Sequence, residues 1–212
     1  MYNDMNEIIE NYLTIGSDYG PVEFKEKGSR FISYAIPINS VEECNKRLSI
    51  LRKKYYDCTH ICSAYIIGEG KEDIFRYNDD GEPSGTAGLP IYSEIKGAKL
   101  FNILIPVIRY YGGTKLGTGG LIRAYGNAAK FIIQIIKPVK FHIKKTFKIQ
   151  FKYNFTGDVM NICEKNKIVI IKQEYMQNEI EFIIDVPIGQ VDTINKILIN
   201  KSGGKVELLP TD

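Results

Sequence analysis

The sequence predicts an α+β protein of two domains, and three observations support this prediction. The chain has 212 residues, of which 44% are hydrophobic, so it can form one large or two small domains with buried cores. The hydrophobic pattern changes at Pro138, from helical spacing before it to strict alternation after it. Beyond that point the expected elements follow the order β-α-β-β-α-β, the ferredoxin-like pattern. We therefore expect domains over residues 1–138 and 139–212.

The first domain is expected to begin with a polar arm and a strand. Residues 1–24 are polar and contain the stop signal Gly20-Pro21, so a short leading helix or arm is expected there. Residues 30–38, RFISYAIPI, are rich in β-branched and aromatic side chains, which is typical of a strand.

A helix and a second strand are expected next. Residues 41–56 follow Ser40, a favourable N-cap, and carry an apolar stripe at helical spacing. The stripe consists of Val41, Cys44, Leu48, Leu51 and Tyr55. Residues 61–68, ICSAYIIG, predict a buried strand.

The middle of the chain alternates loops with apolar segments. Residues 69–89 are polar and rich in turn residues, so a loop is expected, followed by a short helix over residues 90–98. Residues 101–111 are nearly all apolar and predict a central strand, in which Pro106 is expected only at an edge or a bulge. The sequence GGTKLGTGG, residues 112–120, forms a glycine-rich loop after this strand.

The helix after the glycine-rich loop is expected to begin near Gly120, to end before Pro138 and to be amphipathic with a basic face. Its apolar stripe consists of Leu121, Tyr125, Ala128, Ile132 and Ile136. Its second stripe consists of Arg123, Asn127, Lys130, Gln134 and Lys137.

The second domain is expected to open with a long strand over residues 141–153. Strict alternation there places Lys144, Lys148 and Lys152 on the side opposite the apolar residues. The elements expected after it are a helix over residues 156–166, strands over 168–175 and 179–186, a helix over 190–202 and a strand over 205–210. Both helices should cover one face of the sheet and leave the other face open.

Charge is distributed unevenly along the chain. The net charge is +3, but residues 95–157 contain 12 Lys or Arg and no Asp or Glu. Such a window is the electrostatic footprint expected of a polyanion-binding surface. The alternative is that these bases only mark solvated faces.

A cytoplasmic location is expected. No apolar run approaches the length of a membrane span, and the residues MYNDMNEIIE carry acids where a secretory signal would carry bases. The four cysteines have no paired spacing, so free thiols are expected.

The glycine-rich loop matches neither nucleotide-binding motif. Thr118 stands where a P-loop needs lysine, and Ile122 stands where the dinucleotide fingerprint needs its third glycine. Glycines still allow backbone N–H groups to approach a ligand, and a helix start presents free amides to an anion. The sequence therefore predicts an anion site, most simply for phosphate, and the alternative is a structural turn. The residues assigned to this site are Arg109, Gly112, Gly113, Lys115, Gly117, Gly119, Gly120 and Arg123.

The stretch DDGEPSGTAG, residues 79–88, is a second candidate site loop. Its carboxylates could bind Mg²⁺ or act as general acid and base, or they could pair with nearby bases within a turn-rich loop. The candidate residues here are Asp79, Asp80, Glu82, Ser84 and Thr86.

His60 lies in the string CTHIC, for which a buried, hydrogen-bonded histidine is the favoured interpretation. On a strand Cys58 and Cys62 would lie about 13 Å apart, too far to share a zinc ion. A functional role for His60 beside the two loops stays open. No catalytic residue and no metal ligand is assigned.

Four motifs resemble the YigZ/IMPACT family. They are EFKEKGSRFI (23–32), DCTHICSAY (57–65), NDDGEPSGTAGLPI (78–91) and RYYGGTKLGTGGLIRAYG (109–126). Cys58 and Tyr111 depart from the residues expected at their positions, a small apolar residue and Phe, without changing the charges of the motifs. The resemblance implies an N-terminal α/β domain like domain two of ribosomal protein five, and a C-terminal domain like domain V of elongation factor G. It also links eukaryotic members to translational control.

We therefore expect a protein that binds RNA or a ribosomal surface, without sequence specificity, and acts in translation regulation. Lys144, Lys148 and Lys152 are expected to extend the phosphate-binding surface. One alternative is an enzyme acting on a small phosphorylated or anionic substrate at the same two loops. Another is a protein–protein module in translational control. A binding protein is favoured over an enzyme, with no cofactor and no membrane contact.

Overall fold

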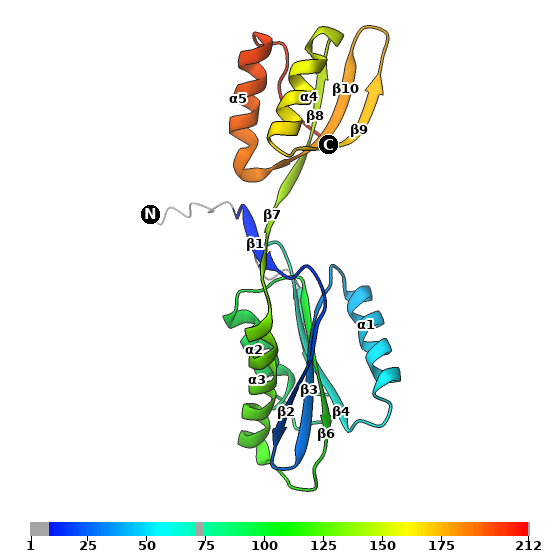
Figure 1. Ribbon diagram of the computed structural model, residues 1–212, viewed down its shortest axis with the longest axis vertical. Helices are drawn as coiled ribbons and strands as arrows, with labels where there is room; N and C mark the ends of the chain where they lie inside the picture. Colours follow the sequence, from blue (N-terminus) through cyan, green and yellow to red (C-terminus); the bar gives the residue numbers. More distant parts are fainter. Residues whose placement is uncertain (1–8, 71–73, 212) are drawn as a thin grey trace, which may run out of the picture. The chain divides into compact units, whose positions relative to one another are not determined.

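Two compact units make up the chain in the computed structural model, which describes residues 9–70 and 74–211 (Figure 1). The N-terminal unit comprises residues Asn11–Phe141. The C-terminal unit comprises residues 142–211 together with residues 9 and 10. The α+β fold class is confirmed, and we propose that these units are the two domains expected from the sequence. No helix in the described ranges has the length and apolar character needed to cross a membrane.

A five-stranded antiparallel sheet in the order β2-β3-β6-β4-β5 forms the centre of the N-terminal unit. The strands are β2 (Tyr19–Glu26), β3 (Ser29–Pro37), β4 (His60–Ile67), β5 (Ile74–Asn78) and β6 (Ile103–Tyr110). Helix α1 (Val41–Lys54) covers one face, and α2 (Gly88–Gly97) with α3 (Gly117–Ile135) cover the other (Figure 1). The central strand β6 is apolar over residues 103–108 because both of its faces are buried.

Successive residues of β6 supply two separate cores. Leu104 and Ile108 pack with Cys44 and Leu51 of α1 on one face. Ile103, Ile105 and Val107 pack on the other face with a larger cluster that includes the whole apolar stripe predicted for α3. Each residue of that stripe is buried, so the predicted orientation of this helix is confirmed.

Pro106 lies in the central strand, and the pairing has no register shift there, so the expectation of an edge or a bulge is wrong. The paired residues of β6 and β3 include Ser33↔Val107 and Ile36↔Leu104, with an interruption between them opposite Pro106. This interruption accommodates the missing N–H of the proline, while the pairing with β4 continues through Ser63↔Pro106.

Three strands, β1 (Asn11–Thr14), β2 and β5, lie where no strand was predicted, because pairing with a neighbouring strand creates them rather than their own residues. The leading helix or arm is wrong over residues 9–24, where β1 and β2 lie and β1 pairs with β7 (Val139–His142). The first eight residues of that prediction lie outside the described residues. Strand β5 occupies part of the segment expected to be a loop. The long strand expected over residues 141–153 divides at Ile143, whose N–H donates to the Glu10 carbonyl while its own carbonyl accepts from Ile188.

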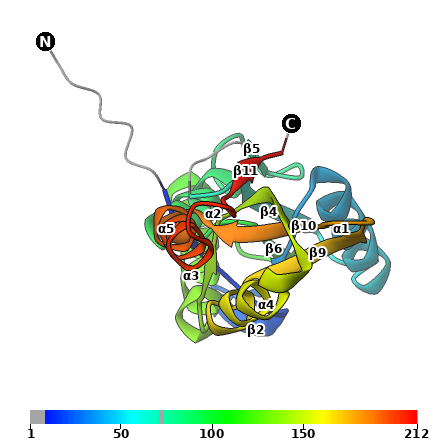
Figure 2. The ribbon, with the colours of Figure 1, turned by 90° about the horizontal axis from the view of Figure 1, so that it is seen from above.

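The C-terminal unit has the predicted ferredoxin-like topology. Its sheet has the order β11-β8-β10-β9, formed by β8 (Lys144–Phe151), β9 (Val169–Tyr175), β10 (Ile180–Pro187) and β11 (Leu209–Pro210). Helices α4 (Thr156–Lys165) and α5 (Val191–Ser202) cover one face of this sheet (Figure 2). Short 3-10 turns, Tyr153–Phe155 and Ile188–Gln190, precede the two helices. All four cysteines are free, as expected.

Candidate functional site

Helix α3 begins three residues earlier than predicted, at Gly117 rather than near Gly120. Its N-cap residue, Leu116, makes no side-chain capping bond. The first N–H groups of an α-helix have no partner within the helix. The amides of Gly117, Thr118 and Gly119 therefore point outward from an exposed helix start that carries no acidic residue in its first turn.

The glycines of the loop serve different purposes. A Cβ on Gly112 would lie 1.9 Å from the carbonyl carbon of Gly28, so this glycine lets two backbone segments pack directly against each other. Gly113 and Gly117 have φ angles of +83° and +71°, which disfavour residues with side chains. A Cβ on Gly120 would lie 3.1 Å from the Cβ of Leu116.

Gly119 is the glycine that the protein's own packing does not require. Its φ is not in the left-handed region, and a Cβ there would meet only Arg123 Nη1, at 3.5 Å. A bare backbone at an exposed helix start permits close approach by a ligand.

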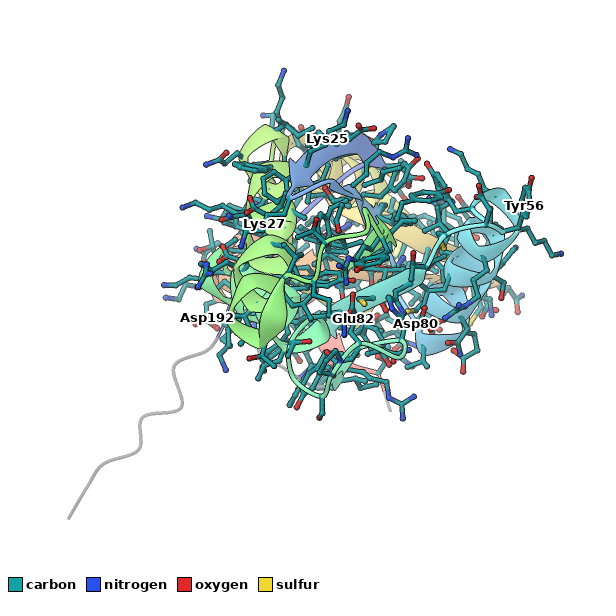
Figure 3. The ribbon with its side chains drawn as sticks, turned by 90° about the horizontal axis from the view of Figure 1, so that it is seen from below. Lys25, Lys27, Tyr56, Asp80, Glu82 and Asp192 are labelled. Atoms are coloured by element: carbon teal, nitrogen blue, oxygen red, sulfur yellow. The ribbon has the colours of Figure 1, made fainter. Side chains whose placement is uncertain are left out.

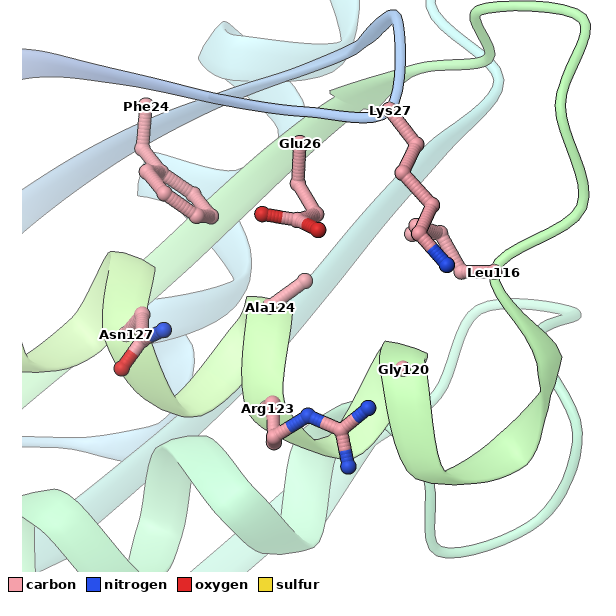
Figure 4. Close-up of a pocket in the computed structure, with 8 residues that line it drawn as sticks. All are labelled: Phe24, Glu26, Lys27, Leu116, Gly120, Arg123, Ala124 and Asn127. Atoms are coloured by element: carbon pink, nitrogen blue, oxygen red, sulfur yellow. The ribbon is translucent and has the colours of Figure 1, made fainter.

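Two unpaired bases flank this helix start. Lys115 and Arg123 make no hydrogen bond or ion pair with any described residue. Arg123 lines a cavity of about 100 Å³ between α3 and the turn that joins β2 to β3. Figure 4 shows Arg123 extending along α3 toward Gly120 while Lys27 reaches down from that turn.

A second cavity, of about 290 Å³, lies on another side of the same helix start and joins the two loops singled out in the sequence. We call it the loop cavity. Its polar lining consists of Glu82, Arg109, Tyr111, Lys115, Gly117 and Thr118. Pro83, Leu116 and Leu121 complete its wall.

Glu82 and Arg109 form a buried ion pair at the wall of the loop cavity. Arg109 Nη1 donates to Glu82 Oε1 at 2.5 Å, and the two side chains are 6% and 5% exposed. The Tyr125 hydroxyl donates to the same Oε1 at 2.7 Å, while Arg109 Nη2 donates to Ser29 Oγ at 3.2 Å. Arg109 is therefore not the exposed phosphate contact that the sequence predicted, because its side chain is buried and paired with Glu82 inside the protein. Its buried Nε has no partner.

The other acids of the 79–88 loop hold the loop itself. Asp79 accepts hydrogen bonds from the backbone N–H groups of Gly85, Ala87 and Gly88, at the start of α2. Asp80 pairs with Arg52 of α1 at 2.5 Å and also accepts from a β4 amide. In Figure 3, Asp80 accordingly lies on the side of α1 and Glu82 on the side of α3.

Ser84 and Thr86 do not line the loop cavity. Thr86 is buried and its hydroxyl donates to the Pro83 carbonyl at 2.7 Å, whereas Ser84 is exposed. The structural interpretation therefore accounts for Asp79, Asp80 and Thr86, which hold the loop, and for Glu82, which pairs with Arg109. Ser84 has no hydrogen bond among the described residues.

His60 is hydrogen-bonded, as predicted, but it is half-buried rather than buried. Its Nδ1 donates to the Asp80 carbonyl at 2.6 Å, so Nε2 is left facing Glu82 Oε1 across 4.0 Å. Within residues 9–70 and 74–211, no group of three or more His, Cys, Asp or Glu side chains could hold a metal ion.

Lys144 and Lys148 of β8 lie on the open face of the C-terminal sheet, but acids of β10 share that face, and Lys152 follows the strand. Lys148 Nζ lies 3.4 Å from Glu181, which also accepts from Gln150. Lys144 and Lys152 are exposed and have no ion pair among the described residues. This face is therefore less basic than β8 alone predicted.

Tyr125 was predicted only as a core residue, and its polar role was missed. Its ring is fully buried while its hydroxyl bonds Glu82. Burial raises the pKa of the Tyr125 phenol, and the nearby Cys62 thiol and Glu82 carboxylate add to the rise. The available signal was that a buried tyrosine hydroxyl nearly always has a partner.

Comparison with known proteins identifies related sequences across nearly the whole chain. The family models named Impact N-terminal domain and Domain of unknown function (DUF1949) match residues 27–133 and 149–205. The Bacillus subtilis "IMPACT family member YvyE" is 31% identical over 95% of this chain and 91% of its own length. The Escherichia coli "IMPACT family member YigZ" is 29% identical, over 86% of this chain and 90% of its own length.

A solved structure also matches the fold. It is described as the crystal structure of a hypothetical protein and superposes with a TM-score of 0.73 at 26% identity. The match covers 97% of this chain and 99% of the other chain.

Alanine at Gly112 and at Gly119 should have opposite effects on stability. Gly112→Ala should lower the free energy of unfolding by about 1–3 kcal/mol, since the new Cβ overlaps Gly28. Gly119→Ala should leave it unchanged or raise it by up to about 1 kcal/mol, because alanine favours the helix. Urea unfolding measures both, and a strongly destabilised Gly119→Ala variant would show that the bare backbone there is structural.

Tyr125→Phe should change the response of stability to alkali. The unfolded chain loses the phenol proton near pH 10.0, whereas the folded chain keeps it, so stability falls as pH rises above that value. Between pH 8 and pH 11 the variant should lose about 1.4 kcal/mol less than the parent protein. At pH 8 it should be less stable by about 2 kcal/mol, owing to the lost bond to Glu82. Urea titrations at both pH values check this, and parallel losses in the two proteins would refute it.

Proposed function

The chain belongs to the IMPACT family, and from this premise we propose that it is an RNA- or ribosome-associated protein acting in translation regulation, which holds phosphate groups at its glycine-rich loop. The motifs that indicated the family also carry the residues of the loop cavity. A cytoplasmic location is part of this proposal.

The single observation that carries the proposal is the uncapped, solvent-exposed start of α3. It combines the free amides of Gly117, Thr118 and Gly119 with the unpaired ammonium group of Lys115. Helix N-termini of this kind bind phosphate because the amides and the helix dipole both favour negative charge. The bare backbone at Gly119 supports the same interpretation, since no contact within the protein requires it.

Fewer of the predicted bases remain available to a polyanion in the folded protein than the sequence alone suggests. Arg109 and Lys148 are paired with Glu82 and Glu181, two acids that lie outside the acid-free window of residues 95–157. Among the described residues, the bases of the predicted set without a hydrogen bond or ion pair are Lys115, Arg123, Lys144 and Lys152. A single-stranded RNA whose phosphates contact all four bases would lose affinity with increasing salt. The slope of log affinity against log salt concentration would be about −3, at roughly −0.7 per contact.

An enzyme acting on a small anionic substrate is a second candidate, favoured by the loop cavity with its buried carboxylate. A protein–protein module in translational control is a third. These alternatives differ in their tests: the enzyme turns over phosphate esters, and the module captures one specific protein while binding RNA weakly.

Binding of labelled single-stranded RNA should be salt-dependent and should require Gly119. Gly119→Ala should weaken binding about tenfold, because the new methyl group keeps phosphate from a charge-assisted amide bond. Gly157→Ala is the matched control, since Gly157 lies in the first turn of α4 with nothing within 4 Å of its Cβ position. Fluorescence anisotropy at several salt concentrations measures both the affinity and the slope.

Lys115→Ala should reduce the magnitude of the slope by about 0.7, the share of one phosphate contact. Equal weakening by Gly119→Ala and Gly157→Ala, or a slope near zero, would count against the proposal. Phosphate-ester turnover by a protein that does not bind RNA would favour the enzyme instead.

A further inference from the structure

We infer that the loop cavity binds one ribonucleotide unit and that Glu82 recognises the 2′-hydroxyl of its ribose. The inference rests on the proposed function, because it takes the phosphate of that unit to lie at the start of α3. It adds a reason for the protein to select RNA rather than DNA.

Glu82 has one saturated and one free carboxylate oxygen. Oε1 accepts from both Arg109 and Tyr125, whereas Oε2 has no hydrogen-bond partner among the described residues. Oε2 is also absent from the fully buried unpaired atoms, so it keeps access to solvent. Because Glu82 lines the loop cavity and its side chain is only 5% exposed, this free acceptor faces the cavity. Water can pair with this acceptor in the free protein, and a ligand that displaces the water has to supply a donor in its place.

The charges around the cavity allow an anion to enter despite this carboxylate. Arg109 neutralises Glu82 at 2.5 Å and is itself held by Ser29. Lys115, which is exposed and unpaired, therefore leaves the lining with an excess of positive charge. The amides of Gly117 and Thr118 lie in the same lining and add their partial positive charge.

The free acceptor and the excess of positive charge in the loop cavity together define the chemistry of the ligand. It must carry an anionic group for the helix start and, within the same small cavity, a neutral hydrogen-bond donor for Oε2. A ribonucleotide has both, as a phosphate and a 2′-hydroxyl, and a deoxyribonucleotide lacks the donor. The volume of about 290 Å³ lies at the small end of ligand sites, which suits one nucleotide unit rather than two. The ring of Tyr111 in the lining adds an aromatic surface of the kind that bases stack on.

The decisive experiment compares four labelled octamers of uridylate in binding to the full chain. They carry a 2′-hydroxyl, a 2′-hydrogen, a 2′-O-methyl or a 2′-fluoro group, and only the first can donate to Oε2. The RNA octamer should bind about tenfold more tightly than each of the others, the value of a hydrogen bond to a charged group. If the 2′-fluoro or 2′-O-methyl octamer binds as tightly as RNA, the protein reads sugar shape and the inference is overturned while the proposed function stands. If none of the four binds, the proposed function fails and the inference fails with it.

Glu82→Gln provides a second test. Arg109 and Tyr125 both donate to the Oε1 position, so the glutamine carbonyl should lie there and its NH₂ group should replace Oε2. A donor then faces the 2′-hydroxyl in place of an acceptor. The RNA and 2′-deoxy octamers should therefore bind the variant with about equal affinity. Tyr125→Phe is the control, because it leaves Oε2 in place and should keep the preference. A folded Glu82→Gln variant that retains a tenfold preference overturns the inference, and if the variant does not fold the four octamers decide alone.

Competition separates a free nucleotide from a unit within a chain as the source of the ligand. Uridine 5′-monophosphate that displaces the RNA octamer, with the 2′-deoxy nucleotide about tenfold weaker, supports the inference with a free nucleotide as ligand. Displacement by both nucleotides at the same concentration overturns it. If neither displaces the octamer at millimolar concentration, a tenfold preference in the octamer series supports the RNA chain as the ligand.

Discussion

The buried ion pair between Glu82 and Arg109 is the interaction on which the candidate site depends. Together with the hydrogen bonds of Ser29 and Tyr125, it ties β3, β6, the 79–88 loop and α3 to one another. Removing one member of such a pair typically costs about 3–5 kcal/mol, because the other charge stays buried. The pair thus holds the start of α3 at a set distance from the 79–88 loop, and the loop cavity lies between them.

Different residues of the candidate site hold the structure together and face a ligand. Asp79 and Asp80 shape the loop, and Gly112 allows the 112–116 segment to pack on the turn between β2 and β3. Groups with no such task, the Gly119 backbone, Lys115 and Glu82 Oε2, are the ones we assign to a ligand. A ligand that meets an already ordered set of donors and acceptors loses less entropy on binding, which is why a rigid scaffold favours recognition.

Much of the fold could be predicted from local patterns, whereas the pairing of charges could not. Alternation in β8 and the helical stripe of α3 each report burial directly, so the ferredoxin-like unit and the orientation of α3 followed from the sequence. Strands β1 and β5 form because a neighbouring strand supplies hydrogen bonds, and their own residues carry little signal. The partner of Arg109 lies 27 residues away in sequence, and that of Lys148 lies 33 residues away on the adjacent strand, so both bases were read as free. The family motifs did locate the two loops that the structure joins.

Amide NMR tests the central claim, that the start of α3 holds phosphate, most directly. In a titration of the ¹⁵N-labelled chain with inorganic phosphate, the N–H signals of Gly117, Thr118 and Gly119 should move first and furthest. The N–H signal of Gly157, in the first turn of α4, should stay in place. Signals from the start of α3 that remain unmoved while signals elsewhere shift would contradict the account.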